Sequence, residues 1–255
     1  MRDDLTRASE TDKSPEQLAQ ELSKRELPKR FYQVATHAAV EGGFTVHLDG
    51  RAVKTPGKAP LVVAAEPLAR AMAAEWQAQE KVIDPGQMPL TRIVNSAIDA
   101  VALRQAEVAD DAAKYCGTDL LCYRADGPDA LVERQRRHWD PVLAWAEELL
   151  GGRFVLIEGL IHRSQPESLL KAYRARLDGL DPLRLAAFHT AVTLTGSAVL
   201  ALALAEGRLT PDETWSAAHV DEDYNIDLWG QDAQAAQIRA YKKAEFDAAS
   251  LILKG

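Results

Sequence analysis

The first third of the chain alternates hydrophobic and polar positions with a period of two. Aromatic and β-branched residues, which favour strands, concentrate in four short stretches, 31–40, 44–48, 51–55 and 61–64. Turn-forming residues separate these stretches at Gly42-Gly43, Asp49-Gly50 and Pro56–Pro60. No segment between them is long enough for a parallel crossover, so the pattern predicts four short strands in an antiparallel meander.

The hydrophobic period becomes helical after Glu66-Pro67, where Leu68, Met72 and Trp76 recur at intervals of four residues. This period continues over most of the remaining chain and predicts helices at 92–115, 129–150, 166–177, 183–206, 211–229 and 234–253, with extended structure only at 120–123 and 154–157. Because the strands come first and the helices follow without alternation, the predicted class is α+β with segregated parts.

The same pattern divides the chain into three parts. Residues 1–30 form a polar arm, in which the capping box Ser14–Gln17, with Pro15 at the first helical position, predicts a short helix that ends before Pro28. Residues 31–84 are expected to form a small N-terminal antiparallel β domain. Residues 85–255 are expected to form a larger all-helical domain.

One predicted helix contains no charged side chain from Leu185 to Ala205, a run of 21 residues. This length could span a bilayer. However, the run includes one histidine and several hydroxyl side chains, follows an Asp181-Pro182 cap and ends near Gly207, as helices of soluble proteins do. We therefore predict a single buried central helix and no stable membrane insertion, with Gly196 and Ser197 allowing a neighbouring backbone to approach closely.

Charge and cysteine content narrow the possible functions. The formal net charge of −8, with no cluster of cationic residues, argues against a nucleic-acid binder. Cys116 and Cys122 have no companion ligand at metal-binding spacing, so we expect free buried thiols in a reducing compartment. Acids match bases from Met1 to Arg30, unlike an organellar presequence. These features favour a cytosolic protein.

Signatures of a cofactor or of catalysis are weak. Gly57-Lys58 precedes Ala59, where a phosphate-binding loop requires Ser or Thr, and we expect no nucleotide cofactor. His219 and Glu222 have the i, i+3 spacing of two ligands on one helix, but no second pair accompanies them, so no metal site is predicted. A small enzyme that uses His189, His219 and Glu222 in an interdomain cleft stays open as an alternative.

The segment HVDEDYNIDLWGQD, residues 219–232, combines five carboxylates with aromatic and aliphatic residues. A capping box at Thr210–Glu213 defines the register of the predicted helix, and at 100° per residue it places Glu222 on one stripe with Trp215 and Trp229. The flanks of that stripe carry Asp221, Asp223 and Asp227. Either these acids are solvated and Glu222 pairs with an internal arginine or backbone amide, or Glu222 meets a donor on a partner protein.

Six ordered blocks resemble one known family. They are FTVHLDGRAVKTP at 44–56, the stretch 68–79 with its EWQAQ, MPLTRIVNSAID at 88–99, GTDLLCYRA from Gly117, QRRHWDPVLAW from Gln135, and VDEDYNIDLWG at 220–230. Together they are similar to the assembly chaperones for the α subunit of F-type ATP synthase, over nearly all of residues 31–230. One departure is Tyr224-Asn225, where relatives often have Gln at the second position.

The resemblance implies a small β domain, a helical domain and no enzymatic activity. It also implies ATP-independent binding of the unassembled α subunit, whose subunit interface is shielded until the β subunit replaces the chaperone. Glu222 corresponds to the acidic residue of the family's Trp-Gly helix, so the expected partner-binding residues are Glu222, Trp229, Asp221, Asp223, Asp227 and Trp215. We expect a monomer, and a scaffold for another complex stays open as a further alternative.

Overall fold

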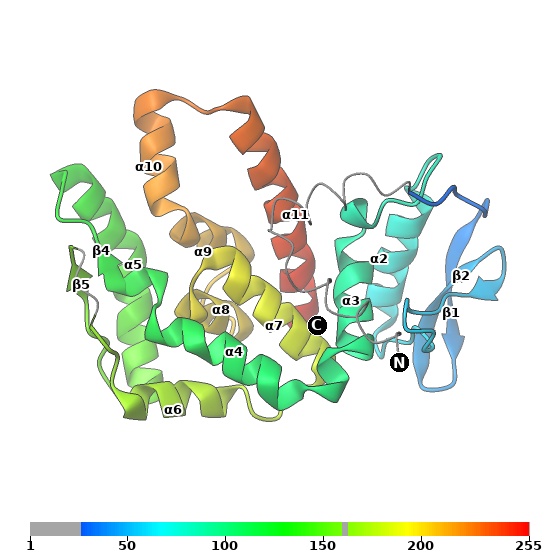
Figure 1. Cartoon of the computed structure of the whole chain (residues 1–255), viewed down its shortest axis with the longest axis horizontal. Helices are drawn as coiled ribbons and strands as arrows, with labels where there is room; N and C mark the ends of the chain where they lie inside the picture. Colours follow the sequence, from blue (N-terminus) through cyan, green and yellow to red (C-terminus); the bar gives the residue numbers. More distant parts are fainter. Residues whose placement is uncertain (1–26, 160–162, 255) are drawn as a thin grey trace, which may run out of the picture.

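The computed structural model describes residues 27–159 and 163–254 of the chain. The small sheet and its covering helix lie at one end of an elongated molecule, and the remaining helices form the larger part (Figure 1). The α+β class is confirmed. The short helix predicted from Ser14 lies outside the described residues.

The N-terminal sheet has three antiparallel strands in the order β1-β2-β3, namely β1 (Ala35–Val40), β2 (Gly43–Leu48) and β3 (Arg51–Ala52). Two tight turns set the register, with Val40 opposite Gly43 and Leu48 opposite Arg51. The fourth predicted strand, 61–64, is wrong as a strand, because only Val63 in this segment forms a bridge, to Phe44, and a second isolated bridge joins Lys54 to the preceding Pro60. Pro60 has no N–H to donate, which limits further pairing.

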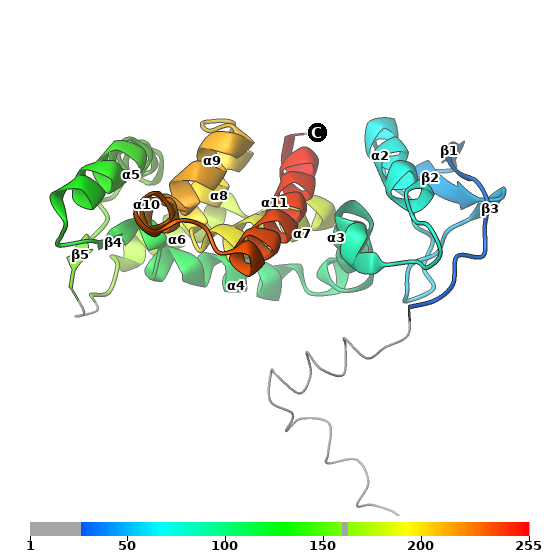
Figure 2. The same cartoon turned by 90° about the horizontal axis from the view of Figure 1, so that it is seen from above.

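Helix α2 (Glu66–Gln77) covers one face of this sheet and contacts both β1 and β2 (Figure 2). Its Leu68 and Met72 are buried, as the four-residue interval predicts. Buried side chains continue from Tyr32 in the β part to Leu253 at the C-terminus as one hydrophobic cluster. The β part therefore packs onto the helices, and the boundary expected at residue 84 stays a prediction.

Two carboxylates join helix α3 (Pro89–Asp99) to the β part. At its N-terminus, Glu75 of α2 accepts hydrogen bonds from the backbone N–H groups of Leu90 (2.7 Å) and Thr91 (2.9 Å). At its C-terminus, Asp99 accepts from the Thr55 hydroxyl (2.6 Å) and the Gly57 N–H (2.8 Å). A Cβ on Gly57 would lie 2.6 Å from Asp99 Oδ1, so a larger residue here would displace this carboxylate.

The single helix predicted at 92–115 is wrong. Helix α3 ends at Asp99, a 3-10 turn occupies Val101–Leu103, and helix α4 spans Gln105–Gly117. The break contains neither Gly nor Pro. Instead, Val101 is buried in the turn, and α3 and α4 both contact helix α7 (Pro182–Thr195), so packing requires the chain to change direction here.

The uncharged run is buried as predicted, but it forms two helices, α7 (Pro182–Thr195) and α8 (Ala198–Ala205). Gly196 separates them in the left-handed conformation, with φ of 65°, and the Ser197 hydroxyl accepts from the Leu200 N–H to begin α8. The predicted close backbone approach at Gly196 is present, because the Leu120 N–H donates to the Gly196 carbonyl (3.3 Å). However, a Cβ at Gly196 would meet no atom within 4 Å, so this approach does not depend on the missing side chain. The glycine is required for its backbone conformation.

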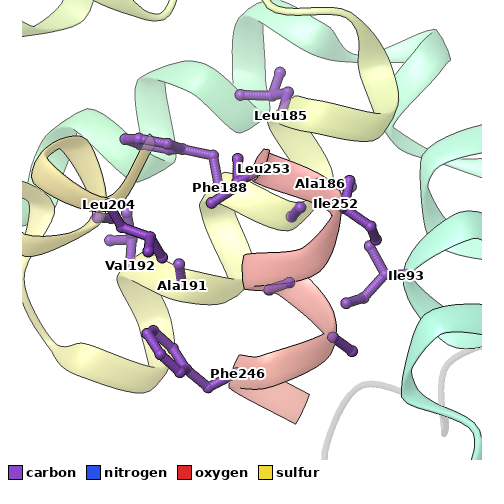
Figure 3. Packing of buried hydrophobic residues seen from close by; sticks show 14 of the residues in the cluster. Ile93, Leu185, Ala186, Phe188, Ala191, Val192, Leu204, Phe246, Ile252 and Leu253 are labelled. Atoms are coloured by element: carbon purple, nitrogen blue, oxygen red, sulfur yellow. The ribbon is translucent and has the colours of Figure 1, made fainter. Parts of the chain in front are cut away.

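Helices from both ends of the chain surround α7, which contacts α3, α4, α8 and α11 (Ala233–Lys254). In Figure 3, Ile93 of α3 and Phe246, Ile252 and Leu253 of α11 lie around α7 side chains such as Phe188.

The other elements are η1 (Pro85–Gln87), η3 (Leu120–Cys122), β4 (Tyr123–Arg124), α5 (Asp129–Leu150), β5 (Ile157–Glu158), α6 (Glu167–Arg176), α9 (Pro211–Ala218), α10 (Val220–Trp229) and α11 (Ala233–Lys254). Strands β4 and β5 pair in parallel. Over the described ranges, every helix is too short or too polar to cross a membrane.

Asp119 is fully buried and connects two distant segments of the helical part. Its carboxylate accepts hydrogen bonds from the Leu121 N–H (3.0 Å), the Ser197 hydroxyl (2.8 Å) and the Val199 N–H (2.9 Å). Burial raises the pKa of Asp119 to about 6, and these hydrogen bonds act in the opposite direction. The carboxylate thus caps the N-terminus of α8 from outside that helix.

Replacement of Gly196 should test the conformational role of this residue. Because a non-glycine residue in the left-handed conformation costs about 1–2 kcal/mol, Gly196→Ala and Gly196→Leu should lower the free energy of unfolding by similar amounts. Urea unfolding of both variants would measure this. A much larger loss for the leucine variant would indicate overpacking and contradict the assignment.

Replacement of Asp119 should test the cap on α8. Asp119→Ala leaves the Leu121 and Val199 N–H groups and the Ser197 hydroxyl without their acceptor in a dry interior, so we expect a loss of about 3 kcal/mol or more. Asp119→Asn keeps one acceptor oxygen and should lose less. Chemical denaturation of both variants provides the comparison, and equal stability of the alanine variant and the parent would refute the cap.

Candidate functional site

The acidic segment begins on a helix whose start is as predicted. Thr210 and Glu213 form the capping box, with the Thr210 hydroxyl accepting from the Glu213 N–H and the Glu213 carboxylate accepting from the Thr210 N–H. Pro211 occupies the first turn. The single helix predicted at 211–229 is nevertheless wrong, because α9 ends at Ala218 and α10 begins at Val220.

His219 accounts for the break. In a continuous helix the Trp215 carbonyl would accept from the backbone N–H of His219. Here that N–H donates to Ser216, and Nδ1 of the imidazole lies 2.8 Å from the Trp215 carbonyl in its place. The ring also packs on the Trp215 indole, with 4.0 Å between ring centroids. The side chain thus replaces the backbone donor and lets the chain change direction.

The break also separates the two tryptophans that the sequence placed on one stripe. Trp215 is only 6% exposed and packs against Phe246. Trp229, at the end of α10, is 84% exposed, and the neighbouring Leu228 is 55% exposed. The predicted common face of Trp215, Glu222 and Trp229 is therefore wrong, since the stripe assumed one unbroken helix.

Three of the acids bind neighbouring helices. Asp221 accepts a hydrogen bond from the Gln135 amide of α5 (2.8 Å). Ion pairs join Asp223 to Arg239 of α11 (2.5 Å) and Asp227 to Arg134 of α5 (2.6 Å). These contacts hold α10 in place between α5 and α11, although Val220 is its only side chain that is buried.

Glu222 differs from the other acids because it has no close partner within the described part of the chain. Its carboxylate is 3.9 Å from Arg239 Nη1 and 3.9 Å from His219 Nε2, and its side chain is 44% exposed. The internal arginine that was expected to pair with Glu222 is therefore present, but at a distance too long for a hydrogen bond. The Glu222 carboxylate also keeps access to solvent. Sequence reasoning missed Arg239, Arg134 and Gln135 as partners, because nothing in their local pattern identifies the helix that they face.

The histidines proposed for an enzymatic site do not share one cavity. His189 Nε2 lies 2.9 Å from Asp111 Oδ2, at a cavity of about 630 Å³ lined by α3, α4, α7 and α11. His219 and Glu222 are not part of that lining. Across residues 27–159 and 163–254, no group of three or more His, Cys, Asp or Glu side chains could hold a metal ion. Cys116 and Cys122 are free and buried as expected, and burial raises the pKa of both thiols.

Comparisons with known proteins extend over both parts of the chain. The family profile described as ATP12 chaperone protein matches residues 29–147. The chain is 47% identical to the Atu1473 protein of Agrobacterium tumefaciens, described as a candidate chaperone, and the two structures superpose with a TM-score of 0.84 over 96% of this chain and 92% of that chain. Atp12 from Paracoccus denitrificans is 40% identical, with a TM-score of 0.79 over 89% of this chain and 97% of that chain.

A more distant similarity reaches a mitochondrial protein. The protein atp12, mitochondrial, of Schizosaccharomyces pombe is 24% identical over 222 residues, which are 82% of this chain and 76% of that protein. The family profile ends before α10, whereas the match to the Paracoccus structure covers 89% of the chain. The resemblance found in the short sequence blocks is thus a similarity of sequence and fold together.

Titration of His219 should affect stability because its side chain is largely buried. Burial lowers the pKa of His219 below its ordinary value of 6.5, so its contribution to stability is fully present above pH 6.5 and is lost as pH falls through the lowered pKa. His219→Asn cannot titrate. Its stability should therefore fall less than that of the parent between about pH 7.5 and about pH 5, measured by urea unfolding. Identical pH profiles would contradict this role.

Proposed function

The chain belongs to the ATP12 chaperone family, which is not an enzyme family, and from this premise we propose that the exposed end of α10 binds the unassembled α subunit of F-type ATP synthase. One observation carries the choice of surface. Trp229 leaves 84% of its side chain in water, beside the exposed Leu228, on a helix that polar contacts hold in place.

An exposed tryptophan of this kind is well suited to anchor a partner. Trp supplies a large apolar area with little conformational entropy to lose, and it is enriched among the residues that dominate binding energy. The contacts of Asp223 with α11 and Asp227 with α5 limit the motion of α10 before a partner arrives. Binding can then proceed without the cost of ordering a loose segment.

Glu222 adds a polar element to this surface. Its distances of 3.9 Å to Arg239 and His219 leave room for a shorter, charge-assisted hydrogen bond from an arginine or backbone amide of the client. Arginines compensate the charges of Asp223 and Asp227, whereas Asp221 is bound by the neutral Gln135 amide, so Asp221 keeps the surroundings of Glu222 negative and favours the approach of a basic client surface. Trp215 contributes indirectly in this scheme, because it packs against His219 at the start of α10.

Shielding and release follow from competition in this proposal. A free α subunit exposes surface that becomes a subunit interface in the synthase, and such surface promotes aggregation. The chaperone covers it without nucleotide chemistry, and the β subunit displaces the chaperone by binding the same interface more tightly. We place this activity in the bacterial cytosol and expect the chaperone to act as a monomer.

The proposal can be tested by refolding the α subunit in the presence of the chaperone. Light scattering should show suppressed aggregation at near-equal stoichiometry, both with and without Mg-ATP. Trp229→Ala should abolish most of this protection, since removal of a Trp anchor commonly costs 2 kcal/mol or more. Phe31→Ala, which removes a similarly exposed aromatic residue from the β part, is the matched control. Loss of protection in the control alone would move the binding surface to the β part.

Substitution of Glu222 tests the polar contact separately. Glu222→Gln keeps the shape of the side chain, so the free energy of unfolding should stay within about 1 kcal/mol, while binding of the α subunit should weaken by roughly 2 kcal/mol or more. Glu206→Gln is a suitable control, because the Glu206 side chain is also 44% exposed, with an arginine at 3.8 Å. Calorimetry measures both quantities. If Glu222→Gln unfolds the protein, Glu222 is a structural anchor, and if neither quantity changes it is a solvated acid.

A further inference from the structure

Two side chains of the described chain lie near the Glu222 carboxylate, and neither forms a hydrogen bond with it. His219 Nε2 and Arg239 Nη1 are each 3.9 Å from Glu222 Oε2, which is beyond hydrogen-bond range. A closer approach of a charged donor would give a charge-assisted hydrogen bond. The surroundings of His219 and Arg239 must therefore account for the longer distances.

The tautomer of His219 removes the first donor. Nδ1 of the ring lies 2.8 Å from the Trp215 carbonyl oxygen. Because a carbonyl oxygen can only accept, Nδ1 carries the ring proton. Burial lowers the pKa of His219, so the ring is neutral near neutral pH and Nε2 has a lone pair in place of a hydrogen. The atom of His219 that lies closest to Glu222 is therefore an acceptor.

Asp223 occupies the second donor. Arg239 Nη1 lies 2.5 Å from Asp223 Oδ1, whereas the same nitrogen is 3.9 Å from Glu222. The two acids are adjacent on α10 and compete for one guanidinium group. The Asp223 side chain is 28% exposed and the Glu222 side chain is 44% exposed. Since water screens a more buried ion pair less, the arginine binds Asp223.

Other cations of the neighbouring helices are also paired with acids other than Glu222. Lys243 of α11 lies 2.6 Å from Asp247, and Arg134 of α5 lies 2.6 Å from Asp227. Arg239 is thus the cation that could reach Glu222 with the smallest movement. Whether Glu222 stays unpaired depends on what holds this one guanidinium group.

We propose that Asp223 is a positioning residue for the client contact of Glu222. By holding the Arg239 guanidinium, Asp223 leaves the Glu222 carboxylate without an internal partner. An arginine or backbone amide of the client then takes the place that Arg239 would otherwise fill. This inference rests on the proposed function, in which Glu222 binds the α subunit. It gives the Asp223–Arg239 ion pair an effect beyond holding α10 against α11.

Breaking this ion pair from either end distinguishes the positioning role from a purely structural one. Asp223→Asn releases Arg239 to pair with Glu222, so binding of the purified α subunit should weaken roughly 10-fold. Arg239→Gln breaks the same ion pair but removes the competing donor, so the affinity should stay within about 3-fold of the parent. The double variant Asp223→Asn, Arg239→Gln should also bind within about 3-fold of the parent. Titration calorimetry measures all of these affinities.

Two results of this comparison would overturn the inference. The first is an unchanged affinity of Asp223→Asn. The second is an equal loss in Asp223→Asn, Arg239→Gln and the double variant, which would mean that the ion pair only holds the helix.

The positioning role also requires that Asp223 acts through Glu222. Introduced into a Glu222→Gln protein, Asp223→Asn should therefore cause no further loss of affinity, because the carboxylate that Arg239 would capture is already absent. A further loss would show that Asp223 affects the client independently of Glu222, and the inference would fail.

A measurement without the client separates this inference from the proposed function. In a crystal structure of Asp223→Asn, a nitrogen of Arg239 should lie within about 3.2 Å of a Glu222 carboxylate oxygen. An Arg239 guanidinium that stays out of hydrogen-bond range of Glu222 would refute the positioning role. If the guanidinium moves as expected but the parent protein does not bind the α subunit, the proposed function fails, and the effect of Asp223 on Arg239 stands.

Discussion

The arrangement of the helical part depends on the burial of an uncharged run, Leu185 to Ala205. Because this run has no charged face to leave in water, other helices must cover all of α8 and most of α7, where Thr193 is the one exposed side chain. Helices α3, α4 and α11 contact α7, and α4, α5, α9 and α11 contact α8. Every side chain from Ala198 to Leu204 is buried as a result. This requirement positions helices that are far apart in the sequence around one centre.

Carboxylates that accept backbone hydrogen bonds from another segment orient the helices around this centre. Glu75 caps α3, Asp99 binds the loop at Gly57, and Asp119 caps α8. Burial raises the pKa of both Glu75 and Asp119, yet their hydrogen bonds favour the charged form. Glu75, Asp99 and Asp119 all lie in the sequence blocks that resemble the chaperone family, so those blocks have a structural role in joining segments.

Helix α10 lies outside this centre and is held by a different kind of interaction. Only Val220 is buried, while Asp221, Asp223 and Asp227 bind side chains of α5 and α11. Ion pairs and hydrogen bonds can fix the position of a helix while its apolar end stays in water. This division explains how four carboxylates and an exposed tryptophan occur together on α10. Three of the acids hold the helix, and Trp229 and Glu222 remain accessible for a partner.

The sequence by itself determined the class of the fold, the type of most elements and the family. The period of two predicted the β1–β3 region, the capping box predicted the start of α9, and the uncharged run predicted the buried centre, since each depends on neighbours in the chain. The tertiary structure decided where long helical patterns break. Packing of Val101 ends α3, the Asp119 carboxylate and the left-handed Gly196 divide α7 from α8, and the His219 contact with Trp215 divides α9 from α10. These breaks change which side chains share a face, and for this reason the stripe of Trp215, Glu222 and Trp229 was wrong although the acidic helix was predicted. A helical period describes one helix at a time, whereas its partners and its end depend on residues 80 or more positions away, as in the contacts of Asp119 with Val199 and of Arg134 with Asp227.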